Sequence, residues 1–228
     1  SEMCIRDRAK SILGDFYLDG RGVEQDKERA LSLYRESAAD GYLPAICSLG
    51  LCYETGDGVA EDKAQAVEWY TRAAEGGYAP AQTNLAVCYF NGIGVDKDVE
   101  CAHQWLEKAA EQKFPRALNI LGDCHWDGTG VEQDRGEAAR LYRQAADQGY
   151  APALCDLGLC YENANGVAED KVQAAECYRK AAEQDYAPAM CNLAVCYLNG
   201  IGVEEDMAQA VAWFQKAVEL SLIHISEP

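Results

Sequence analysis

The residues best suited to chemistry in this chain of 228 residues are its eleven cysteines and three histidines. A cysteine nucleophile needs an imidazole base within hydrogen-bond reach. Only Cys124 with His125, and Cys101 with His103, stand close together along the chain. Nearness in sequence does not supply that geometry, so we predict no catalytic role for either pair.

Other reaction motifs are missing from the sequence. Serine acyl transfer of the penicillin-binding type uses S-x-x-K, S-D-N and K-T-G motifs, and zinc hydrolysis uses H-E-x-x-H. None of these strings is present, and no C-x₂-C pair offers a structural zinc site. We therefore predict that the protein is not an enzyme and holds no metal and no cofactor.

Most of the cysteines recur at equivalent positions of a repeated sequence. One set is Cys52, Cys88, Cys124, Cys160 and Cys196, and a second is Cys47, Cys155 and Cys191. Equivalent positions on packed helices lie about 10 Å apart, whereas a disulfide needs Cα atoms within about 7 Å. We predict reduced and largely buried thiols that pack as small apolar groups.

The repeated sequence has a period of 36 residues and occurs six times. The string GLCYETGDGVAEDK at 50–63 returns as GLCYENANGVAEDK at 158–171, three periods later. A fixed period of this length indicates stacked units that bury their faces against their neighbours. The most regular column is an aspartate, at Asp26, Asp62, Asp98, Asp134, Asp170 and Asp206.

Each repeat is predicted to be a pair of helices. In the second repeat Pro44 stands at the first turn of a helix, and apolar residues follow at helical spacing. Gly56 and its equivalents are expected to end this helix with positive φ. Asp62 and Gln65 have the spacing of a capping box at the start of the second helix. No segment alternates with period two for long enough to predict a strand.

The combined pattern AxxxLGxxYxxGxGVxxDxxxAxxWYxxAAxxGxxxA resembles that of Sel1-like repeats, relatives of tetratricopeptide repeats, over residues 9–219. The resemblance implies an all-α, right-handed α-solenoid of six helix-turn-helix repeats, near 9–44, 45–80, 81–116, 117–152, 153–188 and 189–220. Two departures from the pattern are Ala164 at a loop glycine position and His125 at a tyrosine position.

The two ends of the chain do not follow the repeat. SEMCIRDR at 1–8 and SLIHISEP at 221–228 resemble translated sequencing adapters. We expect both to be non-native extensions of a natural chain that is longer at both ends. Reduced thiols favour a cytoplasmic location. A secreted or periplasmic location stays open, because we expect the natural chain to begin before this sequence, where a leader peptide would lie.

The formal net charge of −18 limits the classes of partner. Such a surface repels phosphate backbones, so we predict no nucleic-acid partner and no anionic membrane surface. The acidity keeps a monomeric fragment soluble. The alternative reading is that it attracts a basic partner.

The family resemblance implies a scaffold or adaptor that binds a protein or peptide segment on the concave face of the solenoid, lined by the first helix of each repeat. The resemblance to tetratricopeptide geometry implies three outward positions on that helix: two residues before the Leu of the pattern, two after it, and one after the Tyr. The predicted partner-binding residues are Asp15, Glu54, Phe90, Asp123, Trp126 and Glu162. They imply a basic partner with an apolar centre, unless the two aromatic rings pack on a neighbouring helix instead.

A second function stays open at this stage. Some Sel1-like proteins are secreted, cysteine-rich and bind or weakly hydrolyse β-lactams. The resemblance implies that those proteins carry a disulfide-bonded cysteine at the end of the second helix. This chain has alanine there in five repeats, at Ala38, Ala74, Ala110, Ala146 and Ala182.

Overall fold

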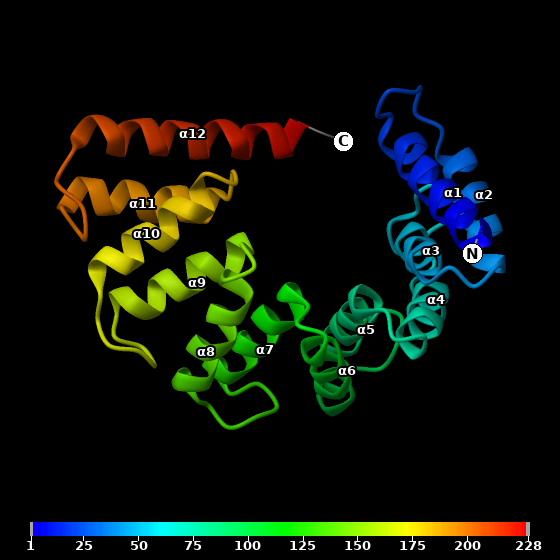
Figure 1. Cartoon of the computed structure of the whole chain (residues 1–228), viewed down its shortest axis with the longest axis horizontal. Helices are drawn as coiled ribbons and strands as arrows, with labels where there is room; N and C mark the ends of the chain where they lie inside the picture. Colours follow the sequence, from blue (N-terminus) through cyan, green and yellow to red (C-terminus); the bar gives the residue numbers. More distant parts are fainter. Residues whose placement is uncertain (1, 227–228) are drawn as a thin grey trace. The chain divides into compact units, whose positions relative to one another are not determined.

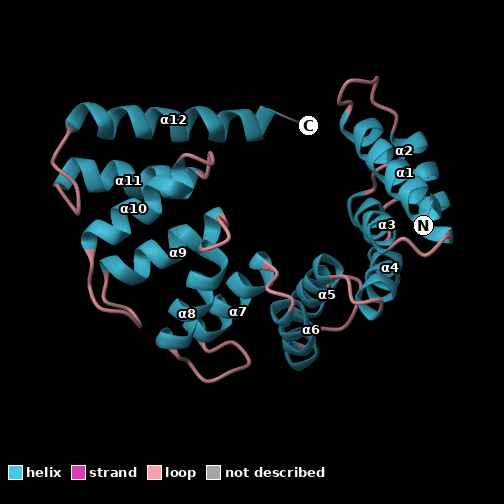
Figure 2. Cartoon of the chain, in the orientation of Figure 1, coloured by secondary structure: helices cyan, strands magenta, loops and turns pink. Residues whose placement is uncertain are grey.

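The computed structural model describes residues 2–226 of the chain, and within that range it contains twelve helices and no strand (Figures 1 and 2). The predicted all-α repeat fold is confirmed, with two helices in each of the six repeats. The chain divides into two compact units, Ser1–Gln112 (unit 1) and Lys113–Pro228 (unit 2), which are treated separately below.

The helices of unit 1 are α1 (Glu2–Asp19), α2 (Lys27–Ala39), α3 (Leu43–Thr55), α4 (Lys63–Glu75), α5 (Ala79–Asn91) and α6 (Val99–Glu111). Those of unit 2 are α7 (Pro115–Asp127), α8 (Arg135–Ala146), α9 (Ala151–Glu162), α10 (Lys171–Ala182), α11 (Ala187–Asn199) and α12 (Met207–Ser226). Odd-numbered helices are the first helix of each repeat, and even-numbered helices are the second. Within each unit, every helix packs on the next one along the chain, and in unit 2 α7 also contacts α9.

The predicted helix boundaries have the expected local chemistry. Asp62 is the N-cap of α4 and accepts a hydrogen bond from the backbone N–H of Gln65 at 3.0 Å. The equivalent aspartate of each other repeat caps the second helix of that repeat in the same way. Each cap satisfies a backbone N–H that has no partner within the helix. Proline lies in the first turn of α3, α5, α7, α9 and α11. Gly56 ends α3 in the left-handed region, with φ of 80°.

The fifth repeat keeps this turn without the glycine. Ala164 occupies the left-handed position with φ of 55°. The N–H of Asn165 donates to the carbonyl of Cys160 at 3.0 Å, as the N–H of Asp57 does to the carbonyl of Cys52. The turn of the fifth repeat therefore has the same backbone conformation as the others, with alanine in place of glycine.

The core of a repeat depends on a close contact between a glycine of the first helix and a tyrosine of the second. A Cβ atom added at the glycine would lie 2.5–2.6 Å from the ring, for the pairs Gly14–Tyr34, Gly50–Tyr70, Gly122–Tyr142 and Gly158–Tyr178. The third and sixth repeats have alanine in the glycine position and another apolar residue in the tyrosine position, in the pairs Ala86–Leu106 and Ala194–Phe214. The two positions therefore change together.

Both chain ends that were predicted to be non-native extend helices of the structure. Residues 2–8 belong to α1, and the Asp7 carbonyl accepts a hydrogen bond from the Ser37 hydroxyl of α2 at 2.9 Å. Residues 221–226 belong to α12, while residues 1 and 227–228 lie outside the described range. The non-native origin of these segments stays a prediction.

The glycine–tyrosine pairing gives a test by double substitution. Gly50→Ala is expected to lower the free energy of unfolding by about 1–3 kcal/mol, because the new methyl group overpacks against the Tyr70 ring. In a Tyr70→Leu background the same change should cost clearly less, since the third repeat combines Ala86 with Leu106. Urea denaturation of the four proteins measures the coupling. Equal costs in both backgrounds would contradict the packing argument.

The loop alanine gives a second test. Ala164→Gly is expected to raise the free energy of unfolding by up to about 1 kcal/mol, because glycine adopts a left-handed conformation without strain. The matched change in the other direction, Gly56→Ala, is expected to lower it by about 1 kcal/mol or more. Thermal unfolding of both variants decides the point, and a loss of stability in Ala164→Gly would show that this loop depends on the alanine methyl group.

Candidate functional site

The four carboxylates predicted to bind a partner all accept a hydrogen bond from a tyrosine of the same repeat. The tyrosine hydroxyl oxygen lies 2.6–2.8 Å from the carboxylate, in the pairs Tyr34–Asp15, Tyr70–Glu54, Tyr142–Asp123 and Tyr178–Glu162. A buried phenol needs an acceptor. The pKa of Tyr178 lies well above its ordinary value. Burial is the largest cause, and the hydrogen bond to Glu162 is the next.

The acceptor comes from two different positions of the first helix. In the first and fourth repeats it is an aspartate two residues after the Leu of the pattern, and in the second and fifth it is a glutamate one residue after the Tyr. The third and sixth repeats lack the second-helix tyrosine and have Val87, Phe90, Val195 and Leu198 at these positions. These acids thus support the fold, a role that the tyrosine column in the sequence could have revealed.

The two aromatic residues predicted to be anchors are half-buried and contact the second helix of their own repeat. Phe90 of α5 meets the His103 ring edge-on, with centroids 5.5 Å apart. Trp126 of α7 lies near the Tyr142 ring, and the Arg135 guanidinium lies 5.1 Å from its centroid. Phe90 belongs to unit 1 and Trp126 to unit 2, so each is considered with its own unit.

The column two residues before the Leu, predicted to point outward, is instead buried in five of the six repeats, at Ser11, Cys47, Thr83, Asn119 and Cys155, because this side of the helix packs against its neighbours. The other two predicted columns expose apolar side chains besides the predicted anchors. These two columns define a first-helix face in each unit. In unit 1 it comprises Asp15, Leu18, Leu51, Glu54, Val87 and Phe90, and in unit 2 Asp123, Trp126, Leu159, Glu162, Val195 and Leu198, to which we add the half-buried Asp156, one position before the Leu of its repeat. Leu51 is 46 % exposed, and Leu159, Val195 and Leu198 are also open to solvent.

Two carboxylates of the first-helix face of unit 2 share one buried amide. Asn119 of α7 is 6 % exposed, and its Nδ2 lies 3.1 Å from an oxygen of Asp156 on α9. The same Nδ2 lies 3.4 Å from Oδ2 of Asp123, one turn along α7. The Oδ1 atom of Asn119 is buried and has no hydrogen-bond partner.

This pair of carboxylates is held in surroundings that oppose its charge. Burial raises the pKa of Asp156 to about 6, more than the hydrogen bond from Asn119 lowers it, and the nearby Asp123 raises it further. Burial also raises the pKa of Asp123, against the bonds from Tyr142 and Asn119. Perturbed carboxyl groups of this kind gather at functional sites, although packing can also produce them.

A recess in the surface of unit 2 lies between α8, α9 and α10 and has a volume of about 780 Å³. Arg143, Leu154, Tyr161, Cys177 and Lys180 are among its lining residues. Its cations already have partners in the unit, since Arg143 donates to the Tyr161 hydroxyl at 2.8 Å and Lys180 lies 3.6 Å from Glu176.

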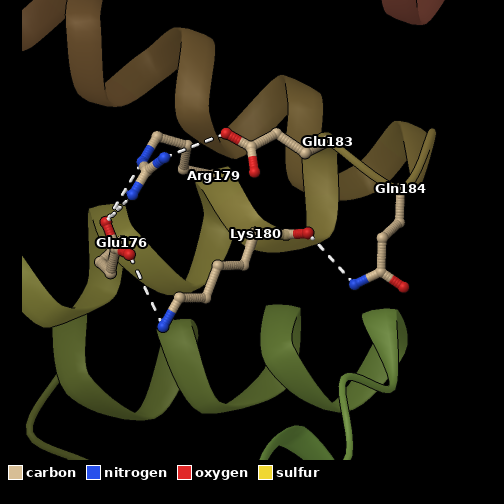
Figure 3. A network of polar contacts seen from close by, with 5 residues as sticks. All are labelled: Glu176, Arg179, Lys180, Glu183 and Gln184. Carbon is tan, nitrogen blue, oxygen red and sulfur yellow. Dashed lines mark hydrogen bonds and ion pairs between the residues drawn. The ribbon is translucent and has the colours of Figure 1, made fainter.

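The surface of α10 beside this recess carries a network of charged side chains (Figure 3). Arg179 joins Glu176 to Glu183, and the Gln184 amide donates to the Lys180 carbonyl at 3.2 Å. Exposed pairs one helical turn apart contribute only a few tenths of a kcal/mol each, about 0.3–0.5. The network therefore supports the helix and leaves little charge for a ligand.

The thiols occupy packing positions, as predicted. Eight of the eleven cysteines are buried, Cys101 is half-buried, and Cys4 and Cys191 are exposed. Burial raises the pKa of Cys124 to about 12, which disfavours the thiolate that a nucleophile requires. Among the residues that the structure describes, no three His, Cys, Asp or Glu side chains are grouped to hold a metal ion. Within the same part of the chain, no helix is both long and apolar enough to cross a membrane.

The buried charge at Asp156 gives a test of the site's electrostatics. A folded-state pKa of about 6 against an ordinary 3.8 means that ionised Asp156 opposes folding at neutral pH. Asp156→Asn is therefore expected to raise the free energy of unfolding at pH 7 by about 1–3 kcal/mol. The gain should vanish as the pH falls through 6 toward 4, where wild-type Asp156 is protonated as well.

Urea denaturation across this pH range measures the effect. Ser48→Asn is the matched control, because Ser48 holds the same place in the second repeat as Asp156 in the fifth. It should show no such pH dependence. A lower stability of Asp156→Asn at pH 7 would mean that the ionised carboxylate is held favourably and that its burial is not costly.

Comparison with known proteins accounts for both the repeat and its helix pairs. The model of the Sel1 repeat family matches six times, at residues 8–42, 43–78, 79–114, 115–150, 151–186 and 187–222. Comparison with curated proteins gave no match. Among solved structures, the chain is similar to c5321 of uropathogenic Escherichia coli, a protective antigen with an SLR fold, at 37 % identity and a TM-score of 0.77. That match covers 93 % of this chain and 46 % of the E. coli protein, so the chain spans less than half of its length.

Two further structures have the same fold. A Sel1 repeat protein from Oxalobacter formigenes is 32 % identical with a TM-score of 0.82, and the match covers 92 % of this chain and 84 % of that one. The immunity protein PA5088 from Pseudomonas aeruginosa is 21 % identical with a TM-score of 0.71, over 95 % and 82 % of the two chains. The six family matches extend over nearly the whole chain. The protein therefore belongs to the Sel1 repeat family.

Proposed function

We propose that this chain is a scaffold that binds an extended segment of a partner protein along the first-helix faces. Proteins of the Sel1 repeat family commonly serve as protein-interaction scaffolds. Stacked helix pairs suit this role, because equivalent side chains of successive repeats form a continuous surface.

The proposal depends on one observation: the exposed large apolar side chains lie mainly on first helices. Outside the first and last helices, the described residues expose four on first helices, namely Leu51, Leu159, Val195 and Leu198. Second helices expose one, Val172 at the start of α10. Apolar side chains that gather on one face and not on the other mark an interaction surface.

The charge of the same faces indicates the chemistry of the partner. Asp15 and Glu54 lie among the apolar residues of unit 1, and Asp123, Asp156 and Glu162 among those of unit 2. A complementary segment has apolar side chains interspersed with basic ones. Such charges mainly set the association rate and the choice of partner, and their effect fades as salt rises.

The β-lactam alternative has no comparable support. The helix-end positions that carry cysteine in the secreted β-lactam-binding relatives are filled here by alanines such as Ala38, Ala74 and Ala182, which are buried in the helix packing. Eight of the eleven cysteines that this chain does have are buried in the helix packing.

Position-specific photo-crosslinking tests the proposal. A benzophenone amino acid at Leu159 or Val195 is expected to form adducts with the same segment of one partner protein, identified by mass spectrometry. The same group at Val172, which is on a second helix and is more exposed, at 64 % against 37 % for Leu159, is expected to give none. Adducts at Val172 as strong as those at Leu159, or none at either first-helix position, would contradict the proposal.

These exposed positions give a cleaner test than the predicted aromatic anchors. Phe90 and Trp126 pack on second helices, so their truncation to alanine changes folding as well as any surface. Substitution of an exposed leucine usually changes stability by less than about 0.5 kcal/mol. Thermal unfolding of each labelled protein provides the control.

A further inference from the structure

Asn119, Asp123 and Asp156 meet at a site where the side-chain atoms that can still form hydrogen bonds are oxygen acceptors, namely the carboxylate oxygens and Oδ1 of Asn119. The donors already present are the Tyr142 hydroxyl, 2.8 Å from Oδ1 of Asp123, and the Asn119 amide nitrogen, which serves both carboxylates. Ionised carboxylates offer about four acceptor positions each. Two protein donors leave most of these positions to solvent at the exposed Asp123 and the half-buried Asp156, and no described cation forms an ion pair with either carboxylate.

The buried Oδ1 of Asn119 is an independent sign of a missing ligand. It belongs to an amide whose nitrogen lies between the two carboxylates, in a side chain with 6 % exposure, and none of the described groups donates to it. A buried acceptor without a donor costs free energy, typically about 1–3 kcal/mol. A ligand with several N–H groups would satisfy this oxygen and the carboxylates together.

We propose that Asn119, Asp123 and Asp156 form a pocket for an arginine side chain of the partner segment. This rests on the proposed function and names the side chain that the first-helix face of unit 2 selects. A guanidinium presents five N–H donors in a planar fork, suited to two carboxylates and an amide oxygen at once. Leu159, one turn beyond Asp156 on α9, supplies an exposed apolar contact for a neighbouring residue of the segment.

The groups around the pocket make the binding dependent on pH. The titratable groups near Asp123 and Asp156 are Asp127 of α7, Tyr142 of α8, Cys155 and Cys160 of α9, and Tyr150 and Tyr186, which precede α9 and α11. Arg116 of α7 acts on Tyr150. Burial places the pKa of Asp156 at about 6, and a bound guanidinium lowers it by favouring the ionised form.

Unit 1 has the same aspartate–tyrosine bond without the pocket. Asp15 accepts from Tyr34 at 2.7 Å, as Asp123 does from Tyr142. In the equivalent repeats, however, Ser11 and Ser48 stand where unit 2 has Asn119 and Asp156. The duplicated sequence thus supplies an internal control with one carboxylate in place of two.

The test uses the full chain and the peptide acetyl-Leu-Val-Arg-Val-Leu-amide, with a second peptide that has citrulline in place of arginine. Citrulline keeps the shape and removes the charge. Calorimetry is expected to show saturable binding of the arginine peptide, about 10–100-fold weaker binding of the citrulline peptide, and the same loss for Asp156→Asn. Ser48→Asn, at the equivalent place in unit 1, should bind as the wild type does.

Two further readouts locate the binding. Carboxyl ¹³C NMR should show that the saturating arginine peptide lowers the pKa of Asp156 from about 6. Affinity should fall about tenfold between pH 7.5 and pH 5 in the wild type, because one proton competes with the guanidinium. The fall should disappear in Asp156→Asn, which separates this carboxyl from every other group that titrates in the same pH range.

The outcomes that would overturn the pocket differ from those that would overturn the scaffold. No saturable binding of the arginine peptide, equal binding of the citrulline peptide, or an unchanged affinity in Asp156→Asn each rejects the pocket. The crosslinks at Leu159 and Val195 could still form in those cases, and the scaffold would stand. A lysine peptide that binds more tightly than the arginine peptide would also reject the guanidinium assignment.

Discussion

The contact between a buried tyrosine ring and a first-helix glycine, completed by a hydrogen bond from the tyrosine hydroxyl to a carboxylate, holds the two helices of four repeats together. In the second repeat the Tyr70 ring leaves no room for a Cβ at Gly50, and its hydroxyl lies 2.6 Å from Glu54. Apolar burial supplies the packing, while the carboxylate satisfies the one polar atom that burial would leave free. Each of the three groups depends on the other two.

Because of this dependence, four acidic residues of the surface have a structural role as well as a proposed role in binding. Asp15, Glu54, Asp123 and Glu162 each give part of their hydrogen-bonding capacity to a tyrosine, so they are held in fixed positions on the first-helix faces. A fixed carboxylate loses less conformational entropy when a ligand binds. The same bonds that complete the core therefore prepare these acids for a basic partner.

Asp156 departs from this arrangement. Among the described residues no tyrosine donates to it and its one donor is an amide shared with Asp123, while burial raises its pKa to about 6. Natural sequences that violate local energetic rules tend to do so at functional sites. In the equivalent place of unit 1 a serine avoids the cost, which makes the second copy of the duplicated sequence the more specialised one.

The sequence alone determined the repeat, the helix pairs, the aspartate caps and the buried thiols, because period, capping chemistry and apolar spacing are local properties of the chain. It also placed the six predicted partner-binding residues on first helices. Only the tertiary structure showed that four of these acids accept from tyrosines, that Phe90 and Trp126 lean on second helices, and that Asn119 joins Asp123 to Asp156. The tyrosine–carboxylate bonds and the Asn119–Asp156 bond link residues 16 to 37 positions apart. Their geometry depends on how neighbouring helices pack, which periodicity does not specify.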